Sequence, residues 1–369
     1  MRIGILSLVL HSNYGGILQS YALQTVLERM GHEVVVFNRP QQYEPTHWND
    51  VPKRLLKKIL GKEDVIFKEI KYKKEAPILC NKIWEFRKKY IHENIIDSLS
   101  EINADEFDAL IVGSDQVWRP RYFTRQWNTS IENAFLAFTK DWTAKRVAYA
   151  ASFGVETWEQ SASETNKTRE AIKMFDAISV REESGIRLLK ENLGVDSIQV
   201  LDPTLLLEKE DYINLINFGD TYKSQGNLLT YILDNSEAKS AFVKRVSEEK
   251  HMLPYSVNNS NVKQSTPVEH RVLPSIEQWL RGFYDAEFVI TDSFHACVFS
   301  IIFNKPFIAL GNKQRGLSRF VSLLRKFGLE KNLIVDTTNY NPNIDFSIPA
   351  TVYERLAELK KKSFDILIF

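Results

Sequence analysis

Few cysteines, little net charge and no long apolar run set the first limits on this chain. Cys80 and Cys297 are the only cysteines among 369 residues, so a disulfide framework is excluded and a reducing cytoplasm is expected. The formal net charge of +1 gives no general attraction to nucleic acid. Because no apolar stretch is long enough to cross a bilayer, we expect a cytoplasmic protein of ordinary globular composition.

The sequence also lacks the patterns of common cofactor sites. Its histidines are scattered without metal-ligand spacing, which predicts that no metal is bound. The turn after the first apolar run contains Gly15 and Gly16 but not the GxGxxG spacing of a dinucleotide site, so no cofactor is expected. The run MRIGILSLVL is followed by glycines and by no small-residue cleavage site. We therefore interpret it as a strand and not as a signal peptide.

The clearest pattern is the stretch EFVITDSFHACVFSIIFNKPFIAL, residues 287–310. An apolar run ends at three residues of helix N-cap type, and an apolar helix of about ten residues follows. A second apolar run begins after Asn304-Lys305-Pro306. This order predicts a strand, a helix and a strand of a parallel sheet. His295 then lies in the first turn of the helix, at the carboxyl edge where open α/β sheets bind ligands.

His295 has the properties of a general base at this position. The positive end of a helix dipole disfavours an imidazolium ion, so the side chain is expected to be neutral and able to accept a proton. The alternative is a histidine that only caps a buried helix. Its place at the ligand edge of the sheet favours the catalytic role.

The first βα turn supplies a second candidate site. Asn13, Gly15 and Gly16 lie between a strand predicted over residues 3–10 and a helix predicted over residues 17–30. Glycines at a helix start allow backbone N–H groups to approach an anion. A plain tight turn explains the same residues equally well.

A strand predicted over residues 107–112 also ends in small polar residues. Ser114, Asp115 and Gln116 follow it and are expected at the ligand edge. Asp115 either orients a hydroxyl or donates a proton, or it caps the next helix. The aromatic segment that continues to Phe138 either stacks on a sugar ring or packs as a loop.

Basic side chains at two further places suit an anionic ligand. Arg181 follows a strand predicted over residues 177–180 and is placed to bind a carboxylate or phosphate through both arms of its guanidinium, or to pair with a nearby Glu. Lys313, Arg315 and Arg319 follow the second strand of the central unit. Arg315 and Arg319 are four residues apart and share one helix face.

Residues 40–100 interrupt the α/β pattern and predict a helical insertion. Between Lys53 and Lys74, basic residues alternate with apolar ones at helical spacing. The basic face is expected to be solvated and to shape a cleft. Contact with the anionic headgroups of a membrane is the alternative, which would make the protein peripheral at the inner membrane face.

The remaining patterns predict two doubly wound, Rossmann-like α/β domains that face one cleft. The first spans residues 1–205 and includes the insertion, and the second spans residues 206–345 and includes the His295 unit. Residues 346–369 contain a helix that is expected to pack back on the first domain. This is a GT-B-like architecture.

Five motifs in order along the chain resemble the polysaccharide pyruvyl transferase family: GSDQVWRP, RVAYAASFG, ISVREESG, VLDPTLLL and VITDSFHACVFSIIFNKPFIAL. The resemblance implies a GT-B-like fold and transfer of the pyruvyl group of phosphoenolpyruvate to sugar hydroxyls as a ketal. It implies that His295 is the essential histidine and that Arg181 binds the donor. The acceptor would be a sugar of a capsule or exopolysaccharide, or of its lipid-linked precursor.

One departure from the family concerns the donor. Ser293 stands where familiar members have an arginine, two residues before the histidine. Since phosphoenolpyruvate carries a carboxylate and a phosphate, we expect Arg315 and Arg319 to supply the missing charge. The acid that the reaction needs is Asp115, Glu182 or Glu183.

Two other functions fit the same architecture. A GT-B glycosyltransferase would use a nucleotide sugar, but we find no persuasive carboxylate for the ribose in the second domain. A sugar- or phosphate-sensing protein would bind the donor without releasing phosphate, because fold does not fix function.

Overall fold

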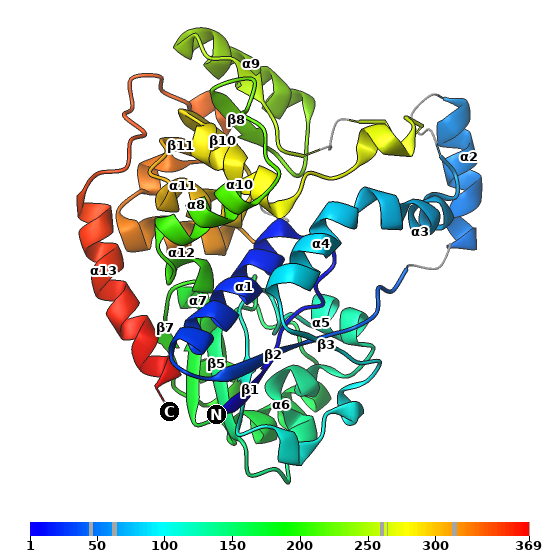
Figure 1. Ribbon diagram of the computed structural model, residues 1–369, viewed down its shortest axis with the longest axis vertical. Helices are drawn as coiled ribbons and strands as arrows, with labels where there is room; N and C mark the ends of the chain where they lie inside the picture. The colour runs from blue at the N-terminus through cyan, green and yellow to red at the C-terminus, as the bar shows by residue number, and fades with distance from the viewer. Residues whose placement is uncertain (44–46, 61–64, 259–261, 264, 312–315, 369) are drawn as a thin grey trace.

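The computed structural model describes residues 1–43, 47–60, 65–258, 262–263, 265–311 and 316–368. Its first sheet is parallel throughout, in the order β3-β2-β1-β4-β5-β6-β7 (Figure 1). The strands are β1 (Arg2–Leu6), β2 (Glu33–Asn38), β3 (Glu93–Ile95), β4 (Ala109–Val112), β5 (Lys145–Ala151), β6 (Ala177–Val180) and β7 (Ile198–Gln199). The helices of this domain are α1 (Tyr14–Arg29), α2 (Val51–Ile59), α3 (Lys68–Leu79), α4 (Asn81–Tyr90), α5 (Pro120–Trp127), α6 (Ala162–Ile172) and α7 (Glu183–Leu193).

The second sheet is also parallel, in the order β12-β11-β10-β8-β9. Its strands are β8 (Leu228–Tyr231), β9 (Pro254–Tyr255), β10 (Phe288–Thr291), β11 (Phe307–Leu310) and β12 (Leu333–Ile334). The helices are α8 (Lys209–Phe218), α9 (Glu237–Lys250), α10 (Ile276–Asp285), α11 (Phe294–Ile302), α12 (Leu317–Phe327) and α13 (Thr351–Phe364).

Both sheets are covered on their two faces. Successive side chains of a strand point to opposite faces. Accordingly, Ala109 and Ile111 of β4 join one apolar core, while Leu110 and Val112 join another. Near-continuous apolar strands of this kind are typical of doubly wound parallel sheets. The predicted fold class is confirmed.

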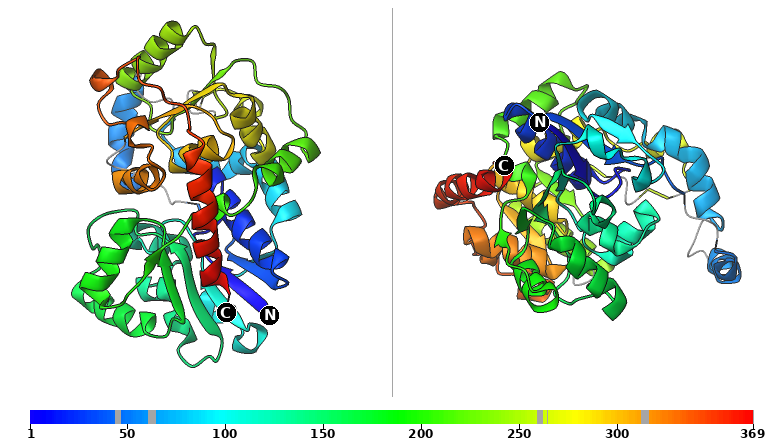
Figure 2. Two further views of the ribbon diagram at one scale, coloured as in Figure 1. Left: turned by 90° about the vertical axis from the view of Figure 1, so that its left-hand side faces the viewer. Right: turned by 90° about the horizontal axis from the view of Figure 1, so that it is seen from below.

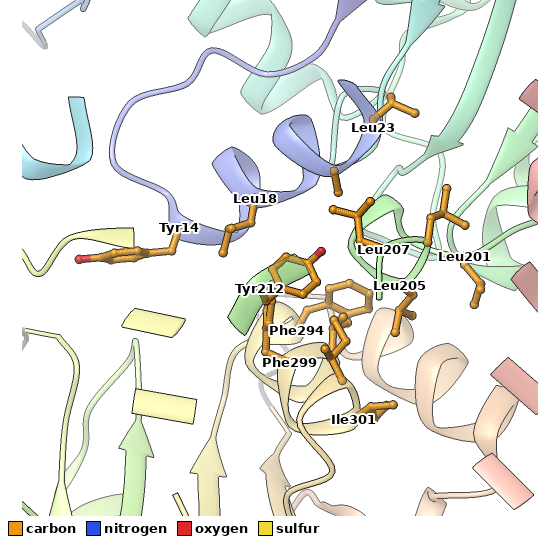
Figure 3. Close-up of a cluster of buried hydrophobic side chains, with 14 of the residues drawn as sticks. Tyr14, Leu18, Leu23, Leu201, Leu205, Leu207, Tyr212, Phe294, Phe299 and Ile301 are labelled. Carbon is orange, nitrogen blue, oxygen red and sulfur yellow. The ribbon is translucent and has the colours of Figure 1, made fainter. Parts of the chain in front are cut away.

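One of these cores continues from the first domain into the second. Tyr14 and Leu18 of α1 belong to the same buried cluster as Phe294 and Phe299 of α11, and Figure 3 shows the side chains gathered between the two helices. Tyr212 of α8 lies in this cluster, and its hydroxyl donates to the carbonyl of Thr204 at 2.8 Å. The shared core fixes the relation between the carboxyl edges of the two sheets.

The C-terminal helix α13 runs alongside both domains (Figure 2). The Tyr353 hydroxyl donates to the carbonyl of Ile301 in the second domain at 2.9 Å. At the other end of the helix, the Ser363 hydroxyl accepts from the backbone N–H of Leu201 at 3.0 Å. The helix therefore connects the central unit of the second domain to the last strand region of the first.

Two elements differ from the sequence prediction. The first strand ends at Leu6 and not at residue 10, because the N–H groups of Val9 and Leu10 bond the side chains of Gln126 and Asn38 instead of a neighbouring strand. The segment of residues 40–100 is helical through α4 but then adds the edge strand β3 to the first sheet. A strand of three residues is too short to show an alternating pattern in the sequence.

Candidate active site

A cavity of about 660 Å³ lies where the carboxyl edges of the two sheets face each other. The first domain contributes residues that follow β1 and β4 and residues of α1, α3 and α5, and the second contributes residues that follow β8 and β10 and residues of α10, α11 and α12. They include Asn13, Tyr14, Gly15, Tyr72, Asp115, Gln116, Tyr122, Tyr231, Trp279, Asp292, Ser293, Phe294, His295 and Arg319. Carboxyl edges are where open α/β sheets bind ligands, so this cavity is the candidate active site.

His295 lies on the wall of this cavity, in the first turn of α11, as predicted. Ser293 is the N-cap residue of the helix and also lines the cavity. The His295 side chain is buried, and its Nε2 lies 3.6 Å from Oδ2 of Asp202. That distance is too long for a hydrogen bond, and Nε2 has no hydrogen-bond partner among the described residues.

Gly15, the second residue of α1, lies where the fold leaves no room for a side chain. A Cβ atom built on Gly15 would lie only 2.0 Å from Nδ1 of His295, which no side chain allows. The absence of a side chain therefore lets the first turn of α1 approach the imidazole ring directly. A Cβ on Gly16 would meet only the Asn13 amide at 3.2 Å and the Asp115 carboxylate at 3.6 Å. Gly15 thus lies next to His295, 280 positions away in the sequence, and Gly16 lies near Asp115, 99 positions away. Asn13 is close to Gly16 and lines the same cavity.

Asp202 and Arg181 form a buried ion pair behind the histidine. Arg181 Nη1 lies 2.9 Å from Oδ2 of Asp202, and Arg181 Nη2 lies 3.4 Å from Oδ1 of Asp115. The Oδ1 atom of Asp202 accepts from the Thr204 hydroxyl at 2.7 Å. Burial opposes ionisation of Asp202, but its contacts with His295 and Arg181 hold its pKa far below the ordinary range. Asp202 is therefore a carboxylate at neutral pH.

Asp115 adopts an unusual backbone conformation at the end of the loop after β4, with φ of 74°. Left-handed geometry is uncommon for residues other than glycine and marks a side chain that the surrounding structure holds in place. Burial alone would raise the pKa of Asp115, but nearby charges, chiefly Arg181, lower it. The alternative role, that of a helix cap, is wrong, because Arg119 is the N-cap residue of α5.

Arg319 brings a second guanidinium group to the site from α12. Both guanidinium groups lie against the Phe294 ring, with Cζ of Arg181 4.6 Å and Cζ of Arg319 5.6 Å from its centroid. Burial, together with the charge of Arg181, lowers the pKa of Arg319 to about 10. An anion bound at this wall of the cavity would offset the repulsion between the two groups.

The other predicted site residues fall into three groups. Gln116 lines the cavity and accepts from Arg119 Nη1 at 3.2 Å. Arg181 and Ser114 do not line the cavity but lie behind its wall, where the Ser114 hydroxyl donates to Asp202 at 3.3 Å. The structure therefore does not show these two residues in a position to contact a ligand in the cavity directly. Both can be buried because carboxylates satisfy their polar groups: Arg181 pairs with Asp202 and Asp115, and Ser114 donates to Asp202. Lys313 and Arg315 lie outside the described residues.

The structure separates the three candidates for the acid. Glu182 does not line the cavity and accepts from the Ser152 hydroxyl and from the N–H groups of Phe153 and Gly154, so it shapes the loop after β5. Glu183 is exposed and pairs with Arg325. Of the three, only Asp115 lines the cavity.

The aromatic segment between Trp118 and Phe138 packs mainly as core. Trp118 stacks on Phe135 with ring centroids 4.7 Å apart, and the Trp127 indole donates to the carbonyl of Ser7 at 2.8 Å. Within this segment, Tyr122 is the aromatic residue that lines the cavity. A sugar-stacking role for the other rings is therefore wrong, because they belong to or pack against the apolar core of the first domain and do not line the cavity.

Two carboxylates of the site were missed as functional residues in the sequence. Asp202 belongs to the motif VLDPTLLL and follows β7, and this position at a carboxyl edge is the signal that could have identified it. Asp292 lines the cavity and accepts from the N–H groups of Leu233 and Asp234 and from Lys239 Nζ at 2.6 Å. Its residue type indicated only a helix cap.

Within the described part of the chain, no three His, Cys, Asp or Glu side chains are grouped so that they could hold a metal ion. In the same residues, every helix is too short or too polar to span a bilayer.

Solved structures similar to this chain over most of its length include glycosyl-transferring and epimerising enzymes. UGT89C1 of Arabidopsis thaliana complexed with UDP-L-rhamnose shares 10% identity over 98% of this chain and 94% of its own, with a TM-score of 0.47. The kitacinnamycin glycotransferase shares 12% identity over 99% and 95%, with a TM-score of 0.47. UDP-N-acetylglucosamine 2-epimerase from Rickettsia bellii shares 12% identity over 100% and 96%, with a TM-score of 0.44.

The match to a sequence family is more specific. No curated protein sequence matches the chain significantly. Residues 13–314 match the family model described as polysaccharide pyruvyl transferase, and this range contains His295, Gly15, Asp115 and Asp202. Because the match spans more than half of the chain and most of the candidate site, the protein belongs to the polysaccharide pyruvyl transferase family.

Proposed function

We propose that this protein transfers the pyruvyl group of phosphoenolpyruvate to two hydroxyl groups of a sugar, which forms a cyclic ketal and releases phosphate. The observation that carries the proposal is His295, which lies on the cavity wall between Asp202 and the backbone of Gly15. Family membership supports the transfer of a pyruvyl group to a polysaccharide.

His295 is the proposed base for the sugar hydroxyls. Its Nε2 faces the Asp202 carboxylate at 3.6 Å, which favours the tautomer with hydrogen on Nε2. The lone pair is then on Nδ1, the atom next to Gly15, and both residues line the cavity. Asp202 would also stabilise the imidazolium ion that forms when His295 takes the proton.

The donor anion is proposed to bind between α1, α11 and α12. Arg319 lines the cavity, and Arg181, which contacts the same Phe294 ring, adds positive charge from outside the cavity lining. The first turns of α1 and α11 also line the cavity and bring backbone N–H groups toward an anion. Lys313 and Arg315 precede α12 in the chain and are proposed to supply the positive charge that Ser293 does not.

The reaction needs one proton at the methylene group and loses one from each of two hydroxyls. Protonation of the methylene makes the adjacent enol carbon electrophilic, and the first hydroxyl attacks it. The second hydroxyl displaces phosphate, which leaves with the remaining proton, so atoms and charge balance. Asp115 is the proposed acid. A bound donor competes for the charge of the arginines that lower the pKa of Asp115, and this raises its pKa toward the range of a useful acid.

The proposed acceptor is a sugar of a cell-surface polysaccharide or of its lipid-linked precursor. The cavity of about 660 Å³ extends past His295 to Tyr72 of α3 and Tyr231 of β8. Aromatic side chains of this kind commonly pack against sugar rings, so the half of the cavity away from Arg319 is proposed to receive the acceptor.

Mass spectrometry of a sugar acceptor library incubated with the protein and phosphoenolpyruvate tests the proposal. Acceptors that gain the pyruvyl mass, together with an equivalent release of phosphate, would support it. Donor binding without release of phosphate to any acceptor would favour a binding protein. Thermal stabilisation by nucleotide sugars and not by phosphoenolpyruvate would favour a glycosyltransferase.

A further inference from the structure

The helix α2 and the turn before it form an arm, residues 48–60, that stands out from the body of the molecule. Figure 1 and the right-hand view of Figure 2 show α2 at the end of α3, away from both sheets. Every residue of α2 is exposed or half-buried. The arm is therefore not part of either hydrophobic core.

The two faces of α2 are oriented opposite to those of an ordinary surface helix. At 100° per residue, Leu55, Leu56, Ile59 and Leu60 share one half of the helix, and Lys53, Arg54, Lys57 and Lys58 share the other. The four apolar residues are between 48% and 74% exposed. Surface helices of globular proteins normally turn such a face toward the core.

The basic half of α2 is the half that holds the arm to the protein. Arg54 donates to both carboxylate oxygens of Glu69 in α3, at 2.9 and 2.7 Å, and to the carbonyl of Ile66 at 3.1 Å. The Arg54 side chain is only 15% exposed. This two-armed contact fixes α2 with its apolar half directed to solvent, so the exposure of the leucines is built into the fold.

We propose that the arm is a membrane-surface anchor that inserts its apolar half into the headgroup region of an anionic bilayer. A helix of this type has a strongly apolar face beside a face rich in lysine. Trp48, which is 70% exposed, adds an aromatic ring of the kind that is enriched at membrane interfaces. Residues 50–74 contain nine Lys and Arg but four Asp and Glu, which gives this region the charge that anionic headgroups attract.

Two lysines flank the apolar half of α2: at 100° per residue, Lys53 lies beside Leu60 and Lys58 lies on the side of Leu55. At the edges of the apolar half, these lysines can reach the headgroups of a bilayer that contains anionic lipid. Two arms that met through their apolar halves would instead bring the flanking lysines of the two copies together, which is unfavourable.

The arm also connects to the cavity through α3. Arg54 and Glu69 join α2 to the first turn of α3, and Tyr72 and Leu79 of α3 line the cavity. A helix of 12 residues is about 18 Å long, so one end of α3 would lie near the bilayer and the other at the site. This consequence rests on the proposed function, because it brings a lipid-linked sugar acceptor close to His295.

Co-sedimentation of the full chain with lipid vesicles tests the anchor. The vesicles contain either phosphatidylcholine alone or equal parts of phosphatidylcholine and phosphatidylglycerol, and neither donor nor acceptor is added. Binding is expected only to the mixed vesicles and is expected to weaken as NaCl rises. Because no turnover is measured, failure of the anchor is distinguishable from failure of the proposed reaction.

Two variants, each with a matched control, separate the contributions of the apolar residues and of the lysines of the arm to vesicle binding. Replacing Leu55, Leu56, Ile59 and Leu60 with Ser is expected to reduce vesicle affinity about tenfold or more, because the buried apolar area is lost. Lys53→Gln with Lys58→Gln is expected to weaken binding to mixed vesicles only. The controls are Phe218→Ser with Tyr222→Ser, which are equally exposed apolar residues of the second domain, and Lys361→Gln with Lys362→Gln in α13.

Several results would overturn the proposal. Absence of binding to either vesicle, or equal binding to both, would remove the anchor. Equal loss of binding in the arm variants and in the controls would show a nonspecific effect. A dimer of the wild-type chain that dissociates in the four-residue Ser variant would show that the apolar half of α2 is an interface between two copies.

Discussion

The two sides of the cavity differ in how their charged groups are paired. On the first-domain side, Arg181 lies between the carboxylates of Asp202 and Asp115, at 2.9 and 3.4 Å. On the second-domain side, His295 approaches Asp202 at 3.6 Å, and its Nε2 has no hydrogen-bond partner among the described residues. Arg181 is thus held by two direct ion pairs, whereas His295 has only the longer contact with Asp202 and lines the cavity.

This difference predicts that the first-domain side mainly maintains the geometry of the site and that the second-domain side takes part in the reaction. Buried charges that are paired with each other keep a fixed geometry, but removing one partner leaves the other uncompensated. A group that is not held by a direct ion pair can change its protonation state or its contacts during a reaction at lower cost. Variants of the second-domain side should therefore lose activity with little loss of stability, and variants of the first-domain side should lose stability as well.

The largest effect is expected for His295→Asn. Loss of the proposed base should reduce the rate of pyruvyl transfer about 10²–10⁴-fold, the contribution typical of general acid–base catalysis. The unfolding temperature should stay close to that of the wild type. Turnover is measured as phosphate release with an identified acceptor, and near-normal turnover in this variant would show that another group is the base.

Asp202→Ala is expected to destabilise the protein by about 3–5 kcal/mol, because Arg181 then stays buried with only Asp115 as a partner. Urea unfolding measures the change. The matched control is Asp196→Ala, whose carboxylate is exposed and paired with Lys190, and it should unfold like the wild type. Equal stability of both variants would show that the ion pair between Asp202 and Arg181 does not stabilise the first-domain side of the cavity.

The two carboxylates that pair with Arg181 predict a dependence of stability on pH. The pKa values of Asp202 and Asp115 are lowered in the folded state, so their contribution is fully present above the ordinary Asp pKa of about 3.9. It is lost as pH falls below that value toward the folded-state pKa values. Wild-type stability should therefore fall more steeply with acid than that of Asp202→Asn.

Gly15→Ala directly tests the contact between Gly15 on the first-domain side of the cavity and His295 on the second-domain side. The added Cβ would displace the His295 ring, and a misplacement of about 1 Å costs about 10²-fold in rate. Gly16→Ala is the matched control in the same helix turn, because its Cβ meets only the Asn13 and Asp115 side chains at 3.2 Å or more. If both variants lose activity equally, the close approach at Gly15 has no special role.

The smallest effect is expected for Arg319→Ala. It should weaken binding of phosphoenolpyruvate by about 1–3 kcal/mol, as for the loss of a charged hydrogen bond. Arg319→Lys should restore little, because the planar guanidinium is lost. Arg325→Ala on the same helix is the control, since its side chain is exposed and pairs with Glu183. Calorimetry that finds unchanged donor affinity in Arg319→Ala would place the donor elsewhere.

Much of the site could be predicted from the local sequence. The strand–helix–strand unit around His295 is confirmed because an apolar run, N-cap residues and a second apolar run are all local signals. Ser275 likewise starts α10 and accepts from the N–H of Gln278, as its residue type predicts. These features depend on neighbours within one helical turn.

The pairing of the charges could not be predicted in the same way. In the sequence, Asp202 stands out only as part of the motif VLDPTLLL, because only the folded chain brings it next to Arg181 and His295. The reason that Gly15 is a glycine is also visible only there, since its close neighbour is 280 positions away. The sequence contains these residues but gives no information on which of them meet.

The sequence by itself therefore determined the elements, the two parallel sheets and the carboxyl edges at which polar residues gather, because hydrophobic period and helix capping are local. The tertiary structure decided which carboxylates neutralise Arg181, which glycine touches His295 and which half of α2 faces solvent. Each of these depends on a contact between segments far apart in the chain, and its energy depends on burial, which appears only when the two domains close on a common core.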